Sequence, residues 1–192
     1  MADPHLDPAC AVAHGAAPPG PTTRALVAVF ASPVARHLLH FAADAGYATT
    51  LVEPVWERAD GAAHRVASAL DPSFLDGDTD VVVTDHHRPE LGVVLRDALA
   101  YRSRWIGVIG NVRHVGPHVA ALRELGVPDA EVARIHRPIG LDIGSKTPAE
   151  IAIATLAGLI ADRNGRPGGF AWGTPAAAGG RGGQQPGSRS IR

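Results

Sequence analysis

The sequence predicts an α/β protein built on a doubly wound parallel sheet. Short runs of apolar, often β-branched residues alternate with patterns typical of amphipathic helices, and this alternation indicates crossover units with helices on both faces of a sheet. The strand-like runs are apolar at consecutive positions, as expected where both faces of a strand are buried. The 192 residues suffice for one domain with its own core. We therefore expect a single Rossmann-like domain over residues 24–164.

Both ends of the chain differ in composition from this domain. Residues 1–23 are rich in Ala, Pro and Gly, and residues 165–192 are rich in Gly, Pro and Arg. Neither segment can bury enough apolar surface to offset the entropy of ordering, so both are predicted to be disordered tails. The arginines of the second tail suggest contact with RNA, but they form no dense patch, and a solvated tail is favoured.

The first half of the domain alternates strands and helices. Residues 25–30 and 48–52 are predicted as strands, and between them Pro33 opens a helix that ends near Gly46. A weak helical pattern over residues 61–70 precedes a third strand over residues 80–84.

The second half continues the alternation. A helix is predicted over residues 89–100, a strand over 105–109, and a helix over 115–125. A short fifth strand over residues 131–135 then leads to the last helix, over residues 148–163.

Charge and cysteine content narrow the functional classes. The formal net charge of −1 gives no support to a nucleic-acid binder or an anionic-membrane binder. No apolar run reaches the roughly 20 residues of a membrane helix, and acidic residues stand where a signal peptide needs basic ones. Cys10, the single cysteine, excludes an internal disulfide and a multi-cysteine zinc site. A cytoplasmic protein is expected.

Ligands of doubly wound sheets bind beyond the carboxyl ends of the strands, so the segments that follow strands are the candidate binding residues. Five such segments are expected to lie close together. They are residues 31–33, 53–54, 84–87, 110–113 and 138–147.

The first segment takes the place of the glycine-rich phosphate loop of dinucleotide folds. Its sequence, FASPVAR, contains no glycine, and Pro33 removes one N–H donor. Glu53 follows the second strand, where such folds place the acid that binds a ribose. A ribose ligand and a surface acid before a proline turn are equally supported for Glu53.

Thr84, Asp85, His86 and His87 follow the third strand. Histidine and aspartate are metal-ligand types, but adjacent residues of an extended chain point to opposite sides, so two neighbouring imidazoles rarely bind one ion. No metal is therefore expected. Contact with a polar ligand stays open beside a structural role, such as Asp85 capping the next helix.

Gly110, Asn111 and Arg113 follow the fourth strand. The amide and the guanidinium could together hold a phosphate or a carboxylate. A plain turn with a solvated arginine is equally supported.

The loop of residues 138–147 gives the strongest signal for a binding site. The TPAE sequence is typical of a helix start: Thr147 caps the helix, Pro148 takes its first position, and the Glu150 side chain bonds back to the backbone of the capping residue. Small residues and a cation before a helix N-terminus suit an anion, although the spacing is not that of a Walker A loop. The candidate residues are Gly140, Asp142, Gly144, Ser145, Lys146 (the only lysine) and Thr147.

Three segments of the chain resemble the C-terminal Rossmann domain of the XdhC/CoxI family of molybdenum-cofactor maturation proteins. They are DVVVTDHH, WIGVIGNVRHVGPHVAALRELGV and ARIHRPIGLDIGSKTPAEIAIATLAGLIADRNG. The string PIGLDIGSKTPAEIA is highly specific, and the resemblance covers residues 24–164, most strongly residues 80–164. It implies a chaperone rather than an enzyme, one that binds molybdenum cofactor (molybdopterin) and passes it in matured form to a molybdoenzyme of the xanthine dehydrogenase type.

The chain departs from the family pattern at several places. The loop after the first strand lacks the family's glycines, Glu53 replaces an aspartate, Asp85 and His86 exchange the order of T-H-D-H, and Asn111 replaces a serine. The segment before the first strand is too short to be the family's N-terminal domain. This favours a separate protein that carries that domain as a partner, beside the client molybdoenzyme, and a homodimer also stays open.

Two other functions stay open. The fold and Glu53 allow an NAD(P)-dependent oxidoreductase, although the missing glycines argue against it. The third possibility is a docking domain for a molybdoenzyme that binds no ligand of its own. No nucleophile has an evident general base in the sequence, so no catalytic residue is expected.

Overall fold

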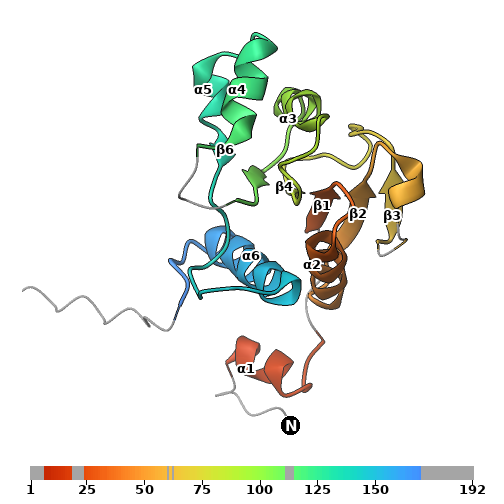
Figure 1. Cartoon of the computed structure of the whole chain (residues 1–192). Helices are drawn as coiled ribbons and strands as arrows, with labels where there is room; N and C mark the ends of the chain where they lie inside the picture. The colour runs from red at the N-terminus through yellow and green to blue at the C-terminus, as the bar shows by residue number, and fades with distance from the viewer. Residues whose placement is uncertain (1–6, 19–23, 60, 62, 111–114, 170–192) are drawn as a thin grey trace, which may run out of the picture.

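The computed structural model describes residues 7–18, 24–59, 61, 63–110 and 115–169, which form a six-stranded parallel sheet flanked by helices (Figure 1). The strand order is β3-β2-β1-β4-β5-β6, with every neighbouring pair parallel. From β1 the chain builds outward to β3, then returns to the other side of β1 and builds outward to β6. This is the doubly wound order, and it confirms the predicted Rossmann-like class.

Most elements lie within a few residues of their predicted positions. The strands are β1 Ala25–Val29, β2 Ala48–Val52, β3 Arg65–Ala67, β4 Thr79–Val83, β5 Trp105–Val108 and β6 Ile135–His136. The helices are α1 Pro8–Ala13, α2 Pro33–Asp44, the 3-10 turn η1 Trp56–Arg58, α3 Leu91–Ala100, α4 Pro117–Glu124, α5 Asp129–Val132 and α6 Pro148–Arg163.

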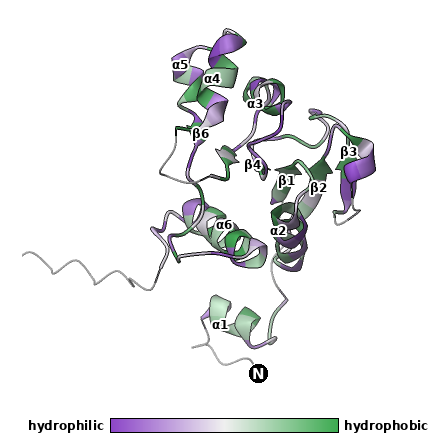
Figure 2. Cartoon of the chain, in the orientation of Figure 1, coloured by the Kyte–Doolittle hydropathy of each residue, from purple (hydrophilic) through white to green (hydrophobic). Residues whose placement is uncertain are grey.

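The sheet has a hydrophobic core on each face. Side chains alternate along a strand, so Val27 and Val29 of β1 pack with residues of α3 and α4, while Leu26 and Ala28 pack with residues of α2 and α6. Helices α2 and α6 lie together on one face, and α3 and α4 on the other (Figure 1). The central strands carry the hydrophobic colour in Figure 2, as the continuous apolar runs predict.

The predicted helix over residues 61–70 is wrong. Arg65–Ala67 instead forms β3, which pairs with β2 at one edge of the sheet. Gly61 has a φ of +68°, a left-handed conformation that does not belong to a right-handed helix. The spacing of Val66 and Leu70 fits a helix, but pairing with the open edge of β2 overrides this weak local preference.

The strand predicted over residues 131–135 is largely wrong as well. Helix α5 occupies Asp129–Val132, and its first turn contains Asp129 and Glu131. Carboxylates in a first helical turn interact favourably with the helix dipole. Strand β6 begins only at Ile135 and pairs with β5.

A short helix lies inside the segment predicted as the N-terminal tail. In α1, Pro8 takes the first helical position and the Asp7 side chain accepts a hydrogen bond from the N–H of Ala9 at 3.2 Å. No residue of α1 is buried, so this helix adds nothing to either core. Residues 170–192 of the predicted C-terminal tail lie outside the described residues.

No helix in the described part of the chain combines the length and the apolar character needed to cross a membrane.

A buried carboxylate fixes the last helix to the sheet. Asp80, near the start of β4, is fully buried and accepts hydrogen bonds from Nε of Arg104 at 2.6 Å and from Nε of Arg163 at 2.9 Å. Arg163 is the last residue of α6. The C-terminal end of α6 is therefore held at the amino edge of the sheet, and its N-terminal end lies at the carboxyl edge.

Candidate functional site

The crevice between the carboxyl ends of β1 and β4 is the position where the doubly wound fold ordinarily binds a dinucleotide. We call it the switch crevice and define it by Phe30, Ala31, Ser32 and Thr84. Phe30 is fully buried and has a φ of +72°, a conformation that is unusual for a bulky residue. The chain thus makes the sharp turn after β1 without a glycine, and a buried phenyl ring lies at the turn.

Glu53 reaches into the switch crevice from the end of β2. Its carboxylate is fully buried and accepts the N–H of Ala31 at 2.8 Å and that of Val55 at 2.9 Å. Arg88 donates to both carboxylate oxygens, at 2.8 and 3.2 Å. Burial alone raises the pKa of Glu53, but the hydrogen bonds from Arg88, Ala31 and Val55 outweigh it and hold the pKa below its usual value.

Three further contacts close the crevice. The guanidinium carbon of Arg88 lies 4.7 Å from the ring centroid of Phe30. Thr84 Oγ1 donates to the carbonyl of Phe30 at 2.7 Å and accepts from Ser32 Oγ at 3.0 Å. Ser32 also caps α2 by accepting the N–H of Ala35 at 3.0 Å. Hydrogen-bonding groups that a pyrophosphate or a ribose would need are therefore already paired within the protein: the N–H groups of Ala31 and Ala35, and the Glu53 carboxylate.

Asp85, His86 and His87 form a turn rather than an extended strand end. Asp85 Oδ1 accepts the N–H of His87 at 3.0 Å, and the two imidazole rings lie 4.1 Å apart. The expectation that these rings diverge is wrong, because the turn brings them to one side. Asp85 does not cap α3, since Glu90 holds the N-cap position there.

In the part of the chain that the structure describes, no group of three or more His, Cys, Asp or Glu side chains is placed to hold a metal ion.

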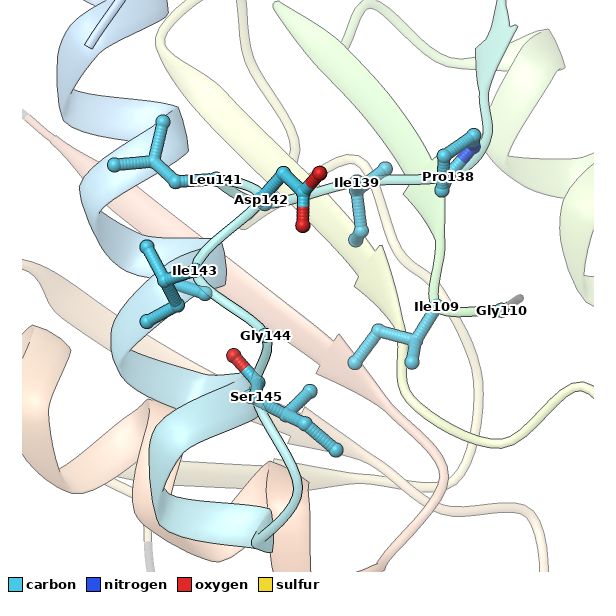
Figure 3. A pocket seen from close by; sticks show the side chains of 12 residues that line it. Ile109, Gly110, Pro138, Ile139, Leu141, Asp142, Ile143, Gly144 and Ser145 are labelled. Atoms are coloured by element: carbon cyan, nitrogen blue, oxygen red, sulfur yellow. The ribbon is translucent and has the colours of Figure 1, made fainter. Parts of the chain in front are cut away.

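A pocket of about 540 Å³ lies on the other side of the carboxyl edge, between the end of β5, the loop of residues 138–145 and α6. We call it the loop pocket. Four isoleucines, Ile109, Ile139, Ile143 and Ile151, contribute apolar walls, and Asp142 and Ser145 contribute the polar side chains. In Figure 3, Ile109 faces the loop across the pocket, and the Asp142 carboxylate extends from the loop into the space between them.

Two glycines set the shape of this loop. Gly140 has a φ of +91°, and a Cβ there would lie 3.1 Å from the backbone of Ala154 and Thr155. A Cβ on Gly158 would in turn lie 3.2 Å from Cα of Gly140. The loop therefore crosses α6 backbone against backbone, and the N–H of Leu141 donates to the carbonyl of Ala154 at 3.0 Å.

The start of α6 is closed by its own capping box. Glu150 accepts the N–H groups of Lys146 at 2.7 Å and Thr147 at 3.0 Å, and Thr147 Oγ1 accepts the N–H of Glu150 at 3.3 Å. These backbone hydrogen bonds hold the pKa of Glu150 below its usual value. The carboxylate thus takes the amides that were expected to receive an external anion, and Lys146 is exposed and is not a wall of the loop pocket.

The structure divides the predicted site residues into groups. Five of them, Gly110, Gly140, Asp142, Gly144 and Ser145, line the loop pocket. Lys146 and Thr147 belong to the adjacent capping box, Glu53 and Thr84 to the switch crevice, and Asp85, His86 and His87 to the turn after β4. Asn111 and Arg113 lie outside the described residues.

Sequence reasoning missed several residues of this edge. Arg88, the partner of Glu53, gave no signal because its role depends on a contact 35 residues away along the chain. Two of the four wall isoleucines, Ile139 and Ile143, were visible in the PIGLDIG string as apolar residues in a loop, which is unusual for an exposed connection. His118 and Arg137, described below, lie on elements that meet only in the folded chain.

Comparison with known proteins identifies the family. Residues 26–159 match the model of the XdhC Rossmann domain. The chain belongs to the XdhC family. The matched range includes the switch crevice, every residue that lines the loop pocket and most of α6. Both sites therefore lie within the family's shared domain.

Two individual proteins are similar to this XdhC-family chain. Over 66 residues it is 43% identical to the uncharacterized protein YqeB of Escherichia coli, a stretch that makes up 34% of this chain and 12% of that protein. Its fold is similar to a solved structure described as a xanthine dehydrogenase from Bacillus halodurans, with a TM-score of 0.60 and 23% identity. That match covers 74% of this chain and 45% of the Bacillus chain, so this chain spans less than half the length of either relative.

Proposed function

We propose that this protein binds molybdenum cofactor in the loop pocket and assists its maturation and insertion into a molybdoenzyme of the xanthine dehydrogenase type. The observation that carries the proposal is the pocket of about 540 Å³ beside the PIGLDIG loop, in a chain of the XdhC family. A volume of this size is typical of small-molecule sites.

The residues of the loop pocket fit the chemistry of molybdopterin. The cofactor has a flat pterin ring with N–H donors, a metal bound through two sulfur atoms, and a phosphate. Ile109, Ile139 and Ile143 offer apolar surface for the ring faces, and the Asp142 carboxylate can accept hydrogen bonds from the ring N–H groups.

When bound, the cofactor would supply the metal centre that the client enzyme needs, whereas the residues of this chain hold and shield it. Isoleucine walls exclude water from the ring faces, and Asp142 orients the ring by its polar edge. The backbone contact between Gly140 and Gly158 holds the loop at a fixed distance from α6. These roles are those of a carrier and require no nucleophile.

The geometry does not favour the alternative of an NAD(P)-dependent oxidoreductase. Glu53, the residue that suggested ribose binding, is engaged by Arg88 and by the N–H of Ala31. A dinucleotide would have to displace this buried ion pair and the Phe30 ring, which lies under Arg88.

The proposal includes a protein partner and a cellular setting. Membership of the XdhC family supports a molybdoenzyme as the client. A second copy of this chain is a further candidate partner, and a cytoplasmic setting agrees with the single cysteine.

Co-purification of the cofactor tests the proposal. The full chain is produced in a host that makes molybdopterin, purified, and analysed for the fluorescent oxidised pterin derivative. We expect the wild-type protein to retain pterin. The pterin content of Asp142→Ala should be lower by a factor of about ten or more, because a charge-assisted hydrogen bond contributes about 1.5–3 kcal/mol.

Asp129→Ala is the matched control, since Asp129 is an exposed carboxylate on α5, away from the loop pocket, and pairs with Arg123. Its pterin content should equal that of the wild type. Absence of pterin from the wild-type protein contradicts the proposal, and an unchanged content in Asp142→Ala contradicts the assignment to this pocket.

A further inference from the structure

Three basic side chains from different elements converge next to the loop pocket. His86 lies in the turn after β4, His118 in the first turn of α4, and Arg137 directly after β6. Both His86 and Arg137 are close enough to His118 to act on it electrostatically. The three side chains therefore share one region of the carboxyl edge.

Two glycines make room for this cluster. A Cβ on Gly110 would lie 2.4 Å from Nε and 2.5 Å from Nη2 of Arg137, and a Cβ on Gly116 would lie 2.3 Å from Nδ1 of His118 and 3.0 Å from Cδ of Arg137. Any other residue at these positions would displace the side chain of Arg137 or His118. Gly110 is also a wall of the loop pocket, so the Arg137 guanidinium lies directly behind that wall.

His118 has an unused polar atom in this cluster. The side chain is 6% exposed, and its Nδ1 is buried without a hydrogen-bond partner among the described residues. Buried polar atoms are nearly always paired, so an orphaned one calls for an explanation. Nδ1 lies against Gly116, the residue that Arg137 also approaches, and it therefore faces the basic cluster.

Two basic side chains, Arg137 and His86, act on His118. Burial, followed by the positive charge of Arg137 and then of His86, holds the pKa of His118 below its usual value. Burial and the neighbouring His87 and Arg137 also hold the pKa of His86 below its usual value, although the backbone of Ile109 and the Asp85 carboxylate act in the opposite direction. The same groups that make protonation of the two imidazoles unfavourable would be favourable neighbours for an anion.

We propose that His86, His118 and Arg137 form a subsite for a tetrahedral oxyanion of the phosphate class. Arg137 supplies the permanent charge and N–H donors, and His118 supplies Nδ1–H once the imidazole is protonated. The first turn of α4, which has no side-chain cap, adds the positive end of a helix dipole.

This subsite deepens the proposed function and rests on it for the identity of the natural ligand. Molybdopterin ends in a phosphate, and the subsite adjoins the loop pocket through Gly110. A ring in the loop pocket would then extend its phosphate toward Arg137 rather than toward Lys146. The N–H groups at the start of α6 are already bound by the Glu150 carboxylate.

Binding of sulfate to the full chain tests the subsite independently of molybdopterin. Sulfate keeps a constant charge between pH 5 and 9, and NMR follows the titration of each imidazole, with assignments from His86→Gln and His118→Gln. In 50 mM sulfate, compared with chloride at equal ionic strength, we expect the His118 pKa to rise by about one pH unit, which corresponds to an approximately tenfold preference of sulfate for the protonated form.

Two variants sharpen the test. Arg137→Gln should abolish the sulfate-dependent change at His118, whereas Arg123→Gln, at an exposed position of α4 paired with Asp129, should leave it intact. If Arg137→Gln does not fold, the wild-type titration still decides. A His118 pKa that is equal in sulfate and chloride overturns the subsite, and pterin that co-purifies despite this result leaves the proposed function standing.

Discussion

The switch crevice and the loop pocket lie at the same edge of one sheet but have opposite characters. In the switch crevice, polar groups of the protein pair with one another: Glu53 with Arg88, and Thr84 with Ser32 and the Phe30 carbonyl. In the loop pocket, isoleucines and glycines surround a volume of about 540 Å³ into which Asp142 extends.

This contrast shows that a fold and its usual ligand site can separate. The doubly wound topology places a crevice between β1 and β4 in any such protein. Here a buried ion pair and a buried phenyl ring convert that crevice into part of the core. The ligand site that we propose lies instead in the half of the sheet that carries β5 and β6.

The largest expected effect concerns the ion pair of the switch crevice. Glu53→Ala should lower the free energy of unfolding by about 3–5 kcal/mol, because it leaves Arg88 buried without its counter-charge. Urea denaturation measures this change, with the exposed Glu57→Ala as control. Apolar replacement of both Glu53 and Arg88 should cost less than Glu53→Ala alone. A loss below about 1 kcal/mol would show that the crevice is not part of the stabilising core.

A smaller effect is expected in the loop pocket, at the crossing of the loop over α6. Gly140→Ala combines a φ of +91° with a contact 3.1 Å from helix backbone, whereas Gly144→Ala has a φ of +70° and open space around its Cβ. We expect losses of about 3 kcal/mol for the first and about 1 kcal/mol for the second, from thermal or urea unfolding. Equal losses would mean that conformational strain alone, and not the close approach, sets the cost.

The smallest effect is a difference in acid sensitivity. The folded protein holds the pKa of Glu53 below its value of 4.5 in the unfolded chain, through its hydrogen bonds from Arg88, Ala31 and Val55 against the cost of burial. This contribution to stability is therefore complete above about pH 4.5 and is lost as the pH falls through the folded-state pKa. Urea unfolding at pH 7 and at pH 4 should show a steeper loss for the wild type than for Glu53→Gln. Parallel profiles would contradict this role of Glu53.

Local sequence patterns were sufficient to predict much of the fold. Continuous apolar runs identified β1, β2, β4 and β5 because strands of this kind are buried on both faces. The capping sequence TPAE placed the start of α6 at Pro148. The patterns failed at two short segments. Arg65–Ala67 forms a strand because it pairs with β2, and Asp129–Val132 forms a helix whose first turn carries two favourable carboxylates.

The candidate site was predictable only where it is contiguous in sequence. Residues from Gly140 to Ser145 form one loop, so their small and polar character was visible at once. The Glu53–Arg88 pair joins positions 35 residues apart, and His118 and Arg137 come together beside Gly116 only in the folded chain. No periodicity in the sequence encodes such contacts.

The ion pair between Asp80 and Arg163 has a consequence at the far end of the helix. Ile139, Ile143 and Ile151 of the loop pocket lie on α6 or on the loop that contacts α6 at Gly140 and at the Glu150 cap. Ile109, on the opposite wall, follows strand β5 of the sheet. The width of the pocket is thus the separation between a helix and a sheet. Asp80 fixes the C-terminal end of α6 at the amino edge of the sheet. The angle between α6 and the sheet therefore determines how far apart the two walls of the pocket stand at the carboxyl edge.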